Sequence, residues 1–186
     1  MNNITAGEVN KLRKATGAGI MDCKNALVES NGDFDLAIEN LRKKGQKVAA
    51  KRADRESSEG AVIATVNNTN DCGIIISLNC ETDFVGKNES FVSLAKEISE
   101  IALECDNLDQ LFNSSFDDTM SVKEKLTEQT GVIGEKIEIG SFVKIKSNFV
   151  GSYIHAGNKI ATLVGLSESF EGCGEVAKNI AMQAAA

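Results

Sequence analysis

The stretch IIISLNCETDFV, residues 74–85, marks the point where the chain changes from strand to helix. Its first part, residues 74–78, is apolar and mostly β-branched, which predicts a buried strand. The residues that follow it, 88–104, repeat apolar side chains at helical spacing and predict an amphipathic helix. Asp83 and Phe84 are therefore expected at a strand-to-helix junction, where rigidly held loops often carry binding residues.

Phe84 beside the carboxylate of Asp83 has two interpretations. The ring could cover the core at the start of the helix, and the spacing alone favours this core plug because most Phe side chains are buried. Alternatively, the ring is exposed and binds a partner.

The pattern around this stretch predicts an α+β fold. Residues 61–66 and 72–80, separated by turn-forming residues 67–71, predict a β-hairpin. An acidic, irregular segment follows, and then come further predicted elements: a helix that begins at the capping box 121–124 and ends at Gly131, strands at 137–139, 142–145, 152–155 and 159–164, and a last helix from about 173. Hairpins followed by helices favour an antiparallel sheet with helices packed on one face.

The first part of the chain predicts a bundle of three short helices. Thr5 and Glu8 fit a capping box at the start of the first helix, and the glycines after Thr16 end it. Asp22 is expected to cap the second helix and Asp33 the third, which Gly45 is expected to end.

Charge divides the chain into two predicted domains. Residues 1–55 hold 11 Lys and Arg against 7 Asp and Glu, a net charge of +4, whereas residues 56–186 hold 9 against 20, a net charge of -11. We predict a domain at 1–55 with a basic connecting helix, and an α+β domain at 56–186. An RNA-binding stripe at residues 46–58 is disfavoured because no aromatic side chain is interleaved for base stacking.

Two sequence motifs carry a resemblance to a known family. TDFV, residues 82–85, and LRKATGAGIMDCK, residues 12–24, resemble the two signatures of elongation factor Ts, the guanine-nucleotide exchange factor of elongation factor Tu. The resemblance implies that the three-helix bundle is a module like the ubiquitin-associated domain. It also implies that this chain matches the N-terminal part of the family pattern, as a truncated or shortened member.

The resemblance also implies which residues bind elongation factor Tu. Phe84, with Asp83, is expected to insert near the Mg²⁺ site of the partner, and the loop at Ile133 and Gly134 is expected to approach its phosphate loop. His155 is expected to contact a neighbouring domain. Ile20 and Met21 either pack under their turn or form a docking patch, which the resemblance favours. The full expected set is Arg13, Ile20, Met21, Thr82, Asp83, Phe84, Val85, Ile133, Gly134 and His155.

The composition argues against several other functions. The five cysteines form no C-x-x-C pair and His155 is the single histidine, so a metal site or a disulfide framework is not expected. A P-loop pattern is absent, and neither a cofactor nor covalent catalysis is predicted. The acidic second domain disfavours nucleic acid as a partner, and the sequence predicts neither a membrane span nor a signal peptide, hence a cytoplasmic protein.

Two other functional classes stay open at this point. One is an interaction module without exchange activity, a peptide-binding bundle fused to an α+β domain. The other is a small cysteine-dependent enzyme that uses His155.

Overall fold

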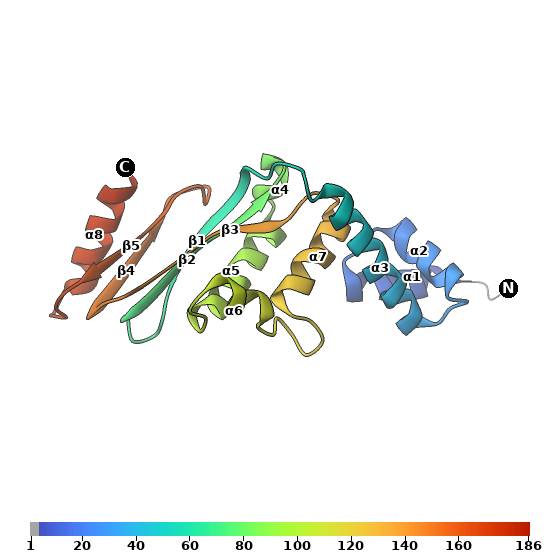
Figure 1. The fold of residues 1–186 in the computed structure, drawn as a ribbon, viewed down its shortest axis with the longest axis horizontal. Helices are drawn as coiled ribbons and strands as arrows, with labels where there is room; N and C mark the ends of the chain where they lie inside the picture. The colour runs from blue at the N-terminus through green and yellow to red at the C-terminus, as the bar shows by residue number, and fades with distance from the viewer. Residues whose placement is uncertain (1–3) are drawn as a thin grey trace. The chain divides into compact units, whose positions relative to one another are not determined.

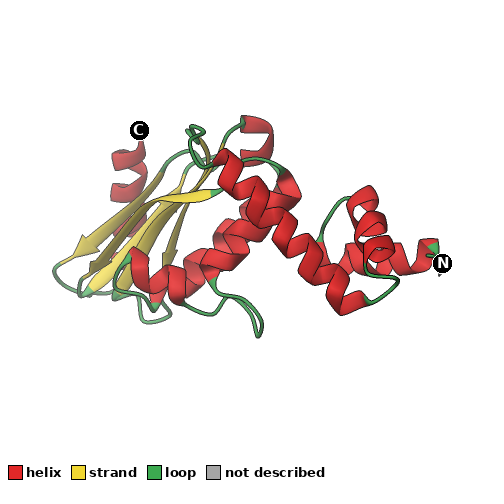
Figure 2. Cartoon of the chain, turned by 45° about the vertical axis from the view of Figure 1, so that its right-hand side comes forward, coloured by secondary structure: helices red, strands yellow, loops and turns green. Residues whose placement is uncertain are grey.

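The computed structural model describes residues 4–186 and has a mixed α+β architecture (Figures 1 and 2). The chain forms two compact units. Unit 1 contains the described residues to Arg55 together with Glu124–Lys136, and unit 2 contains Glu56–Lys123 and Ile137–Ala186. None of the helices among residues 4–186 has the length and apolar character that crossing a membrane requires.

Unit 1 is built from four helices, and the predicted caps are confirmed at two of the first three. These helices are α1 (Ala6–Thr16), α2 (Ile20–Glu29), α3 (Phe34–Arg52) and most of α7 (Val122–Ile133). The capping box of Thr5 and Glu8 is confirmed, and so is the Asp33 cap, whose side chain accepts from the Leu36 amide. The expectation for Asp22 is wrong, because α2 begins earlier, directly after Gly19.

Two glycines that were expected to end helices lie inside them. Helix α3 continues through Gly45 to Arg52, so the expected connecting helix is the last part of α3, and α7 continues through Gly131 to Ile133. The reason is close helix packing: a Cβ atom on Gly131 would lie 2.4 Å from the Cα of Gly45. The two residues are glycines because the backbones of α3 and α7 touch here.

The small core of unit 1 lies between the first three helices. Partly buried Phe34, Ile38 and Leu41 pack against the side of this core. The core itself consists of buried apolar side chains: Val9, Leu12, Ala18, Cys23, Ala26, Leu27 and Ala37.

Unit 2 contains two antiparallel sheets instead of the single predicted sheet. Strands β1 (Glu59–Val66), β2 (Cys72–Cys80) and β3 (Glu138–Lys146) form the first in the order β1-β2-β3, and β4 (Phe149–Ile154) and β5 (Ala161–Leu166) form the second. The predicted hairpin of β1 and β2 is confirmed, with Ile63 opposite Ile76.

Helices cover unit 2 on more than one side. Helix α5 (Glu89–Leu103) packs on β1 and β2, and α8 (Cys173–Ala185) packs on β4 and β5 (Figure 1). The second sheet packs on the other side of the first, close to Gly73. A Cβ atom on Gly73 would lie 2.8 Å from Cγ1 of Val150, so a larger residue would clash with the second sheet. The segment expected to be irregular contains a short helix, α6 (Leu108–Asn113).

Candidate functional site

Phe84 is exposed at the strand-to-helix junction. Strand β2 ends at Cys80, and a single-turn helix, α4 (Asp83–Gly86), follows two residues later. The side chain of Phe84 is 85% exposed, whereas its neighbours Thr82 and Val85 are partly buried. The core-plug interpretation is therefore wrong, since the ring contributes almost none of its surface to the core.

Two glycines fix the position of α4 on the sheet. A Cβ atom on Gly86 would lie 3.1 Å from the backbone of Gly60, so the last residue of α4 packs directly on the start of β1. Gly60 has φ +143°, and a Cβ atom there would lie 2.1 Å from the carbonyl oxygen of Leu78. These contacts favour glycine at both positions and hold Phe84 outward on a rigid base.

Asp83 forms an ion pair within the same turn. Its Oδ2 lies 2.6 Å from Nζ of Lys87, one helical turn further along the chain. This hydrogen bond is the main cause of a lowered pKa for the carboxyl group of Asp83, and the same bond raises the pKa of Lys87. The base of the exposed ring therefore carries a paired negative charge at neutral pH.

His155 lies in the exposed turn after β4. Its Nδ1 is 3.1 Å from the hydroxyl oxygen of Tyr153, and the two rings meet edge to face. The backbone amide of His155 donates to the carbonyl oxygen of Ile160 and closes the turn. The five cysteines are all buried and free, whereas the imidazole of His155 contacts Tyr153. This geometry does not support the Cys–His catalytic pair.

Ile20 and Met21 form an exposed apolar patch on unit 1. They occupy the first turn of α2 and are 53% and 62% exposed, because Cys23, Ala26 and Leu27 take the inward face of that helix. The alternative in which both side chains pack under their turn is wrong. Arg13 is also exposed, in the last turn of α1.

Ile133 is the last residue of α7, and Gly134 begins the loop that follows this helix. Gly134 has φ +81°, and its amide donates to the carbonyl oxygen of Thr130. A Cβ atom at this position would meet no other described heavy atom within 4 Å. A Cβ atom on Gly17 would lie 3.8 Å from Cγ1 of Val132, so the turn that leads into α2 approaches the end of α7 within unit 1.

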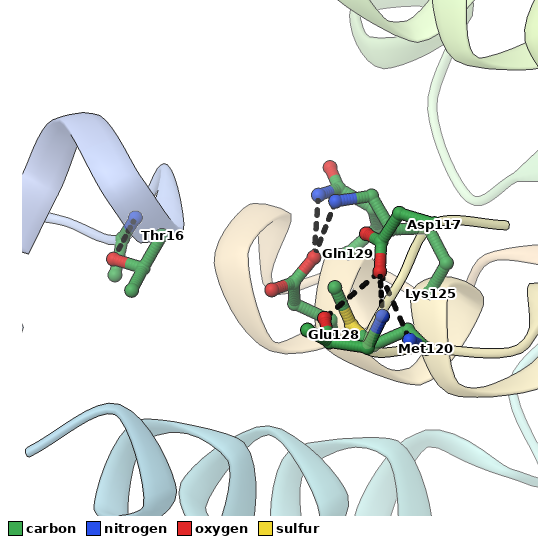
Figure 3. Close-up of polar contacts among 8 residues, drawn as sticks. Thr16, Asp117, Met120, Lys125, Glu128 and Gln129 are labelled. Atoms are coloured by element: carbon green, nitrogen blue, oxygen red, sulfur yellow. Dashed lines mark hydrogen bonds and ion pairs between the residues drawn. The ribbon is translucent and has the colours of Figure 1, made fainter. Parts of the chain in front are cut away.

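Polar side chains on α7 are bonded to one another. Lys125 donates to Glu128 over 2.6 Å, and the Gln129 amide lies 3.5 Å from the same carboxylate oxygen (Figure 3). Both members of the Lys125–Glu128 pair are mostly buried, at 20% and 16% exposure. All three residues lie in α7, so these are contacts within the helix that ends at Ile133.

The structure thus divides the predicted residues between the two units. Arg13, Ile20, Met21, Ile133 and Gly134 belong to unit 1, and the Thr82–Val85 turn and His155 belong to unit 2. The sequence-based interpretation missed the residues that support them, Gly60, Lys87 and Lys159. Lys87 could have been found from its spacing of four residues from Asp83, but Gly60 and Lys159 act through contacts that no local pattern reveals.

A polar cavity of unit 2 lies apart from the predicted site residues. A cavity of about 810 Å³ in unit 2, lined by polar residues such as Asp71, Lys144 and Asn148, contains none of the predicted site residues. No group of three acidic, His or Cys residues among residues 4–186 is placed to hold a metal ion. Of the predicted site residues, the structure leaves five exposed: Arg13, Ile20, Met21, Phe84 and His155.

Comparison with known proteins identifies the family. The family model described as elongation factor TS matches residues 81–186. Elongation factor Ts of Christiangramia forsetii is 66% identical over 186 residues, and that of Flavobacterium psychrophilum is 62% identical; each alignment covers 100% of this chain and 68% of the relative. Elongation factor Ts of Flavobacterium johnsoniae is 57% identical, and the chain spans 57% of its length. The chain belongs to the elongation factor Ts family, as its two motifs predicted.

Proposed function

We propose that this chain binds elongation factor Tu with bound GDP and promotes release of the GDP, so that GTP can bind in its place. Membership in the elongation factor Ts family supports an exchange-factor role in general terms. The observation that carries the proposal for this chain is the exposed ring of Phe84 on its rigid turn. Burying a Phe side chain contributes about 2 kcal/mol, enough for a binding preference of roughly thirtyfold.

The mechanism follows from differential binding. A G protein holds its nucleotide through a phosphate loop and a bound Mg²⁺. A factor that binds the empty form more tightly than the loaded form must lower the affinity for nucleotide by the same factor, because the coupling is reciprocal. In this proposal Phe84 and Asp83 disturb the Mg²⁺ site, and the loop at Ile133 and Gly134 disturbs the phosphate loop.

Other residues bind the partner without acting on the nucleotide. Arg13, Ile20 and Met21 hold the G domain, and His155 contacts a neighbouring domain. The adaptable side chain of Met21 suits an apolar docking patch. Thr82 and Val85 shape the turn beneath Phe84.

The remaining details belong to the same proposal. The first three helices form a ubiquitin-associated-like module in a domain at 1–55, the domain at 56–186 carries the exchange residues, and the protein works in the cytoplasm. The exchange requires no covalent chemistry, cofactor or metal of its own.

The test is release of a fluorescent GDP from purified elongation factor Tu, with and without this chain at micromolar concentration. We expect clear acceleration, and the rate should saturate as the chain is increased. If the chain binds nucleotide-free elongation factor Tu but does not accelerate GDP release, it is an interaction module and the exchange proposal is wrong. If the chain neither binds elongation factor Tu nor accelerates GDP release, the choice of partner is refuted.

A further inference from the structure

The turn that carries His155 is fastened to the start of β1. The amide of Val62 donates to the carbonyl oxygen of Asn158 over 2.8 Å. The ammonium group of Lys159 donates to Oε2 of Glu59 over 2.5 Å and to the carbonyl oxygen of Gly60 over 3.2 Å. Since β1 is an edge strand of its sheet, the turn covers backbone groups that would otherwise be unpaired.

Helix α4 rests on the same residue of β1. The backbone of Gly60 accepts the Lys159 bond through its carbonyl oxygen, and the Cα of Gly86 packs against it as described above. Figure 1 shows the β4–β5 turn, the start of β1 and α4 at the same end of the sheets of unit 2. One glycine therefore connects the element that carries Phe84 with the element that carries His155.

The electrostatic interactions of Asp83 also indicate that Lys159 lies near α4. The Lys87 hydrogen bond is the main cause of the lowered pKa of Asp83, and the positive charge of Lys159 lowers that pKa further. Lys159 therefore acts on both sides of the junction, through bonds to β1 and through its field at the base of α4.

We propose that Lys159 is a positioning residue, which holds the Phe84 turn and the His155 turn as one preformed docking surface for the G-protein partner. This inference rests on the proposed function. A partner that contacts both turns binds better when their separation is fixed in advance, because less ordering is required on association. A contact of Lys159 with the partner itself is the alternative that the experiment must separate.

The experiment compares variants in the GDP-release assay, scored as the second-order rate constant for acceleration. Lys159→Met removes the clamp, and Lys159→Arg keeps both donors. The exchanged pair Lys159→Glu with Glu59→Lys keeps the ion pair, but it loses the donor to the Gly60 carbonyl oxygen and reverses the charge that a partner meets. Lys178→Met, which removes an exposed lysine on α8, is the control for lost charge.

We expect Lys159→Met to lower the rate constant about fivefold, a coupling in the usual range for residues that share contacts. Lys159→Arg and Lys178→Met should remain close to the unsubstituted chain. The exchanged pair should recover only part of the loss, because it restores the ion pair but not the hydrogen bond to Gly60. Amide hydrogen exchange at Val62 provides a second readout without the partner: it should be faster in Lys159→Met and normal in Lys159→Arg.

Two results would overturn the positioning role while leaving the proposed function intact. One is an undiminished rate constant in Lys159→Met although the Val62 amide exchanges faster. The other is a lowered rate constant in Lys159→Met although the Val62 amide exchanges at its normal rate, which would indicate direct contact of Lys159 with the partner. An unsubstituted chain without any activity would refute both proposals. Should Lys159→Met fail to fold, Glu59→Gln weakens the same clamp from β1 and gives the same comparison.

Discussion

Phe84 is a residue at which effects on folding and on exchange can be measured separately. Because its ring is 85% exposed, Phe84→Ala should change the thermal midpoint of unfolding very little. The same variant should slow GDP release at saturating concentration by about tenfold or more, as expected for an aromatic anchor of an interface. The measurement is the saturation curve of GDP release together with a melting curve.

Phe170→Ala is the matched control for this substitution. Phe170 is also an exposed Phe, at 51%, but it lies in the loop before α8 and belongs to no proposed binding element. Loss of exchange in both variants would mean that general surface hydrophobicity matters, and a lowered melting temperature with normal exchange in Phe84→Ala would assign the ring a structural role.

The ion pair beside this ring leads to a prediction about pH. The folded pKa of Asp83 is lowered, so the pair stabilises the fold above the ordinary carboxyl pKa of 3.8, and this contribution disappears as pH falls through the folded value. The folded pKa of Lys87 is raised, so its contribution is present below 10.5 and disappears as pH rises through the folded value. Titration of this pair should therefore leave exchange unchanged across neutral pH.

Lys87→Met tests the cause of the carboxyl shift. It should raise the pKa of Asp83 towards 3.8 in a titration followed by carboxyl NMR, with little change in thermal stability because the pair is exposed. An unchanged pKa would show that Lys87 is not the main cause.

At this scale the sequence identified the candidate residues but not their exposure. The motif at residues 82–85 located Phe84, yet the preference for buried Phe favoured the wrong interpretation. Whether a side chain at a junction is covered depends on where the neighbouring elements pack. For α4 that is decided by Gly60 and Gly86, which lie 26 positions apart in the printed sequence.

Among the elements, α3 and α7 depend on a glycine contact. Gly131→Ala would place a methyl group 2.4 Å from the Cα of Gly45, so the two helices must separate. We expect the free energy of unfolding to fall by about 1–3 kcal/mol, as in overpacked cores. Denaturant unfolding monitored by circular dichroism measures this.

Gly7→Ala is the matched control for this helix substitution. Gly7 also lies inside a helix, α1, but among residues 4–186 a Cβ atom there meets only the Thr5 side chain, at 3.8 Å. We expect this variant to be more stable by about 0.5 kcal/mol, since Ala has the higher helix propensity. A destabilisation of equal size in both variants would argue against the close contact.

The same contact explains which elements could be predicted. Capping residues such as Thr5 and Asp33 act on the next few amides, so local sequence was enough to locate two of the helix starts in unit 1. Gly45 and Gly131 were interpreted as helix ends because glycine is a common stop signal. Their actual role arises from a partner helix about 86 positions away in the printed sequence, which no local pattern could reveal.

At the scale of the whole molecule, unit 1 is assembled from two separate parts of the chain. The residues to Arg55 supply three helices, and Glu124–Lys136 supplies most of a fourth. The hydrophobic pattern predicted the α+β class and the first three helices, but it could not assign α7 to them because that pairing is non-local. The contact of Gly131 with Gly45 packs α7 against the bundle, which we expect it to stabilise.

A fragment of residues 1–55 should therefore be only marginally stable. A chain of this size has a small core, and without α7 the backbone of α3 at Gly45 loses its packing partner. We expect a free energy of unfolding below about 3 kcal/mol by denaturant titration. Excess peptide of residues 124–136 should raise the thermal midpoint of the fragment, because a ligand that binds the folded form alone stabilises it. The same peptide with Gly131→Val should not, since its side chain would meet the α3 backbone. A fragment that is fully stable alone, or equal effects of the two peptides, would show that the first three helices fold without α7.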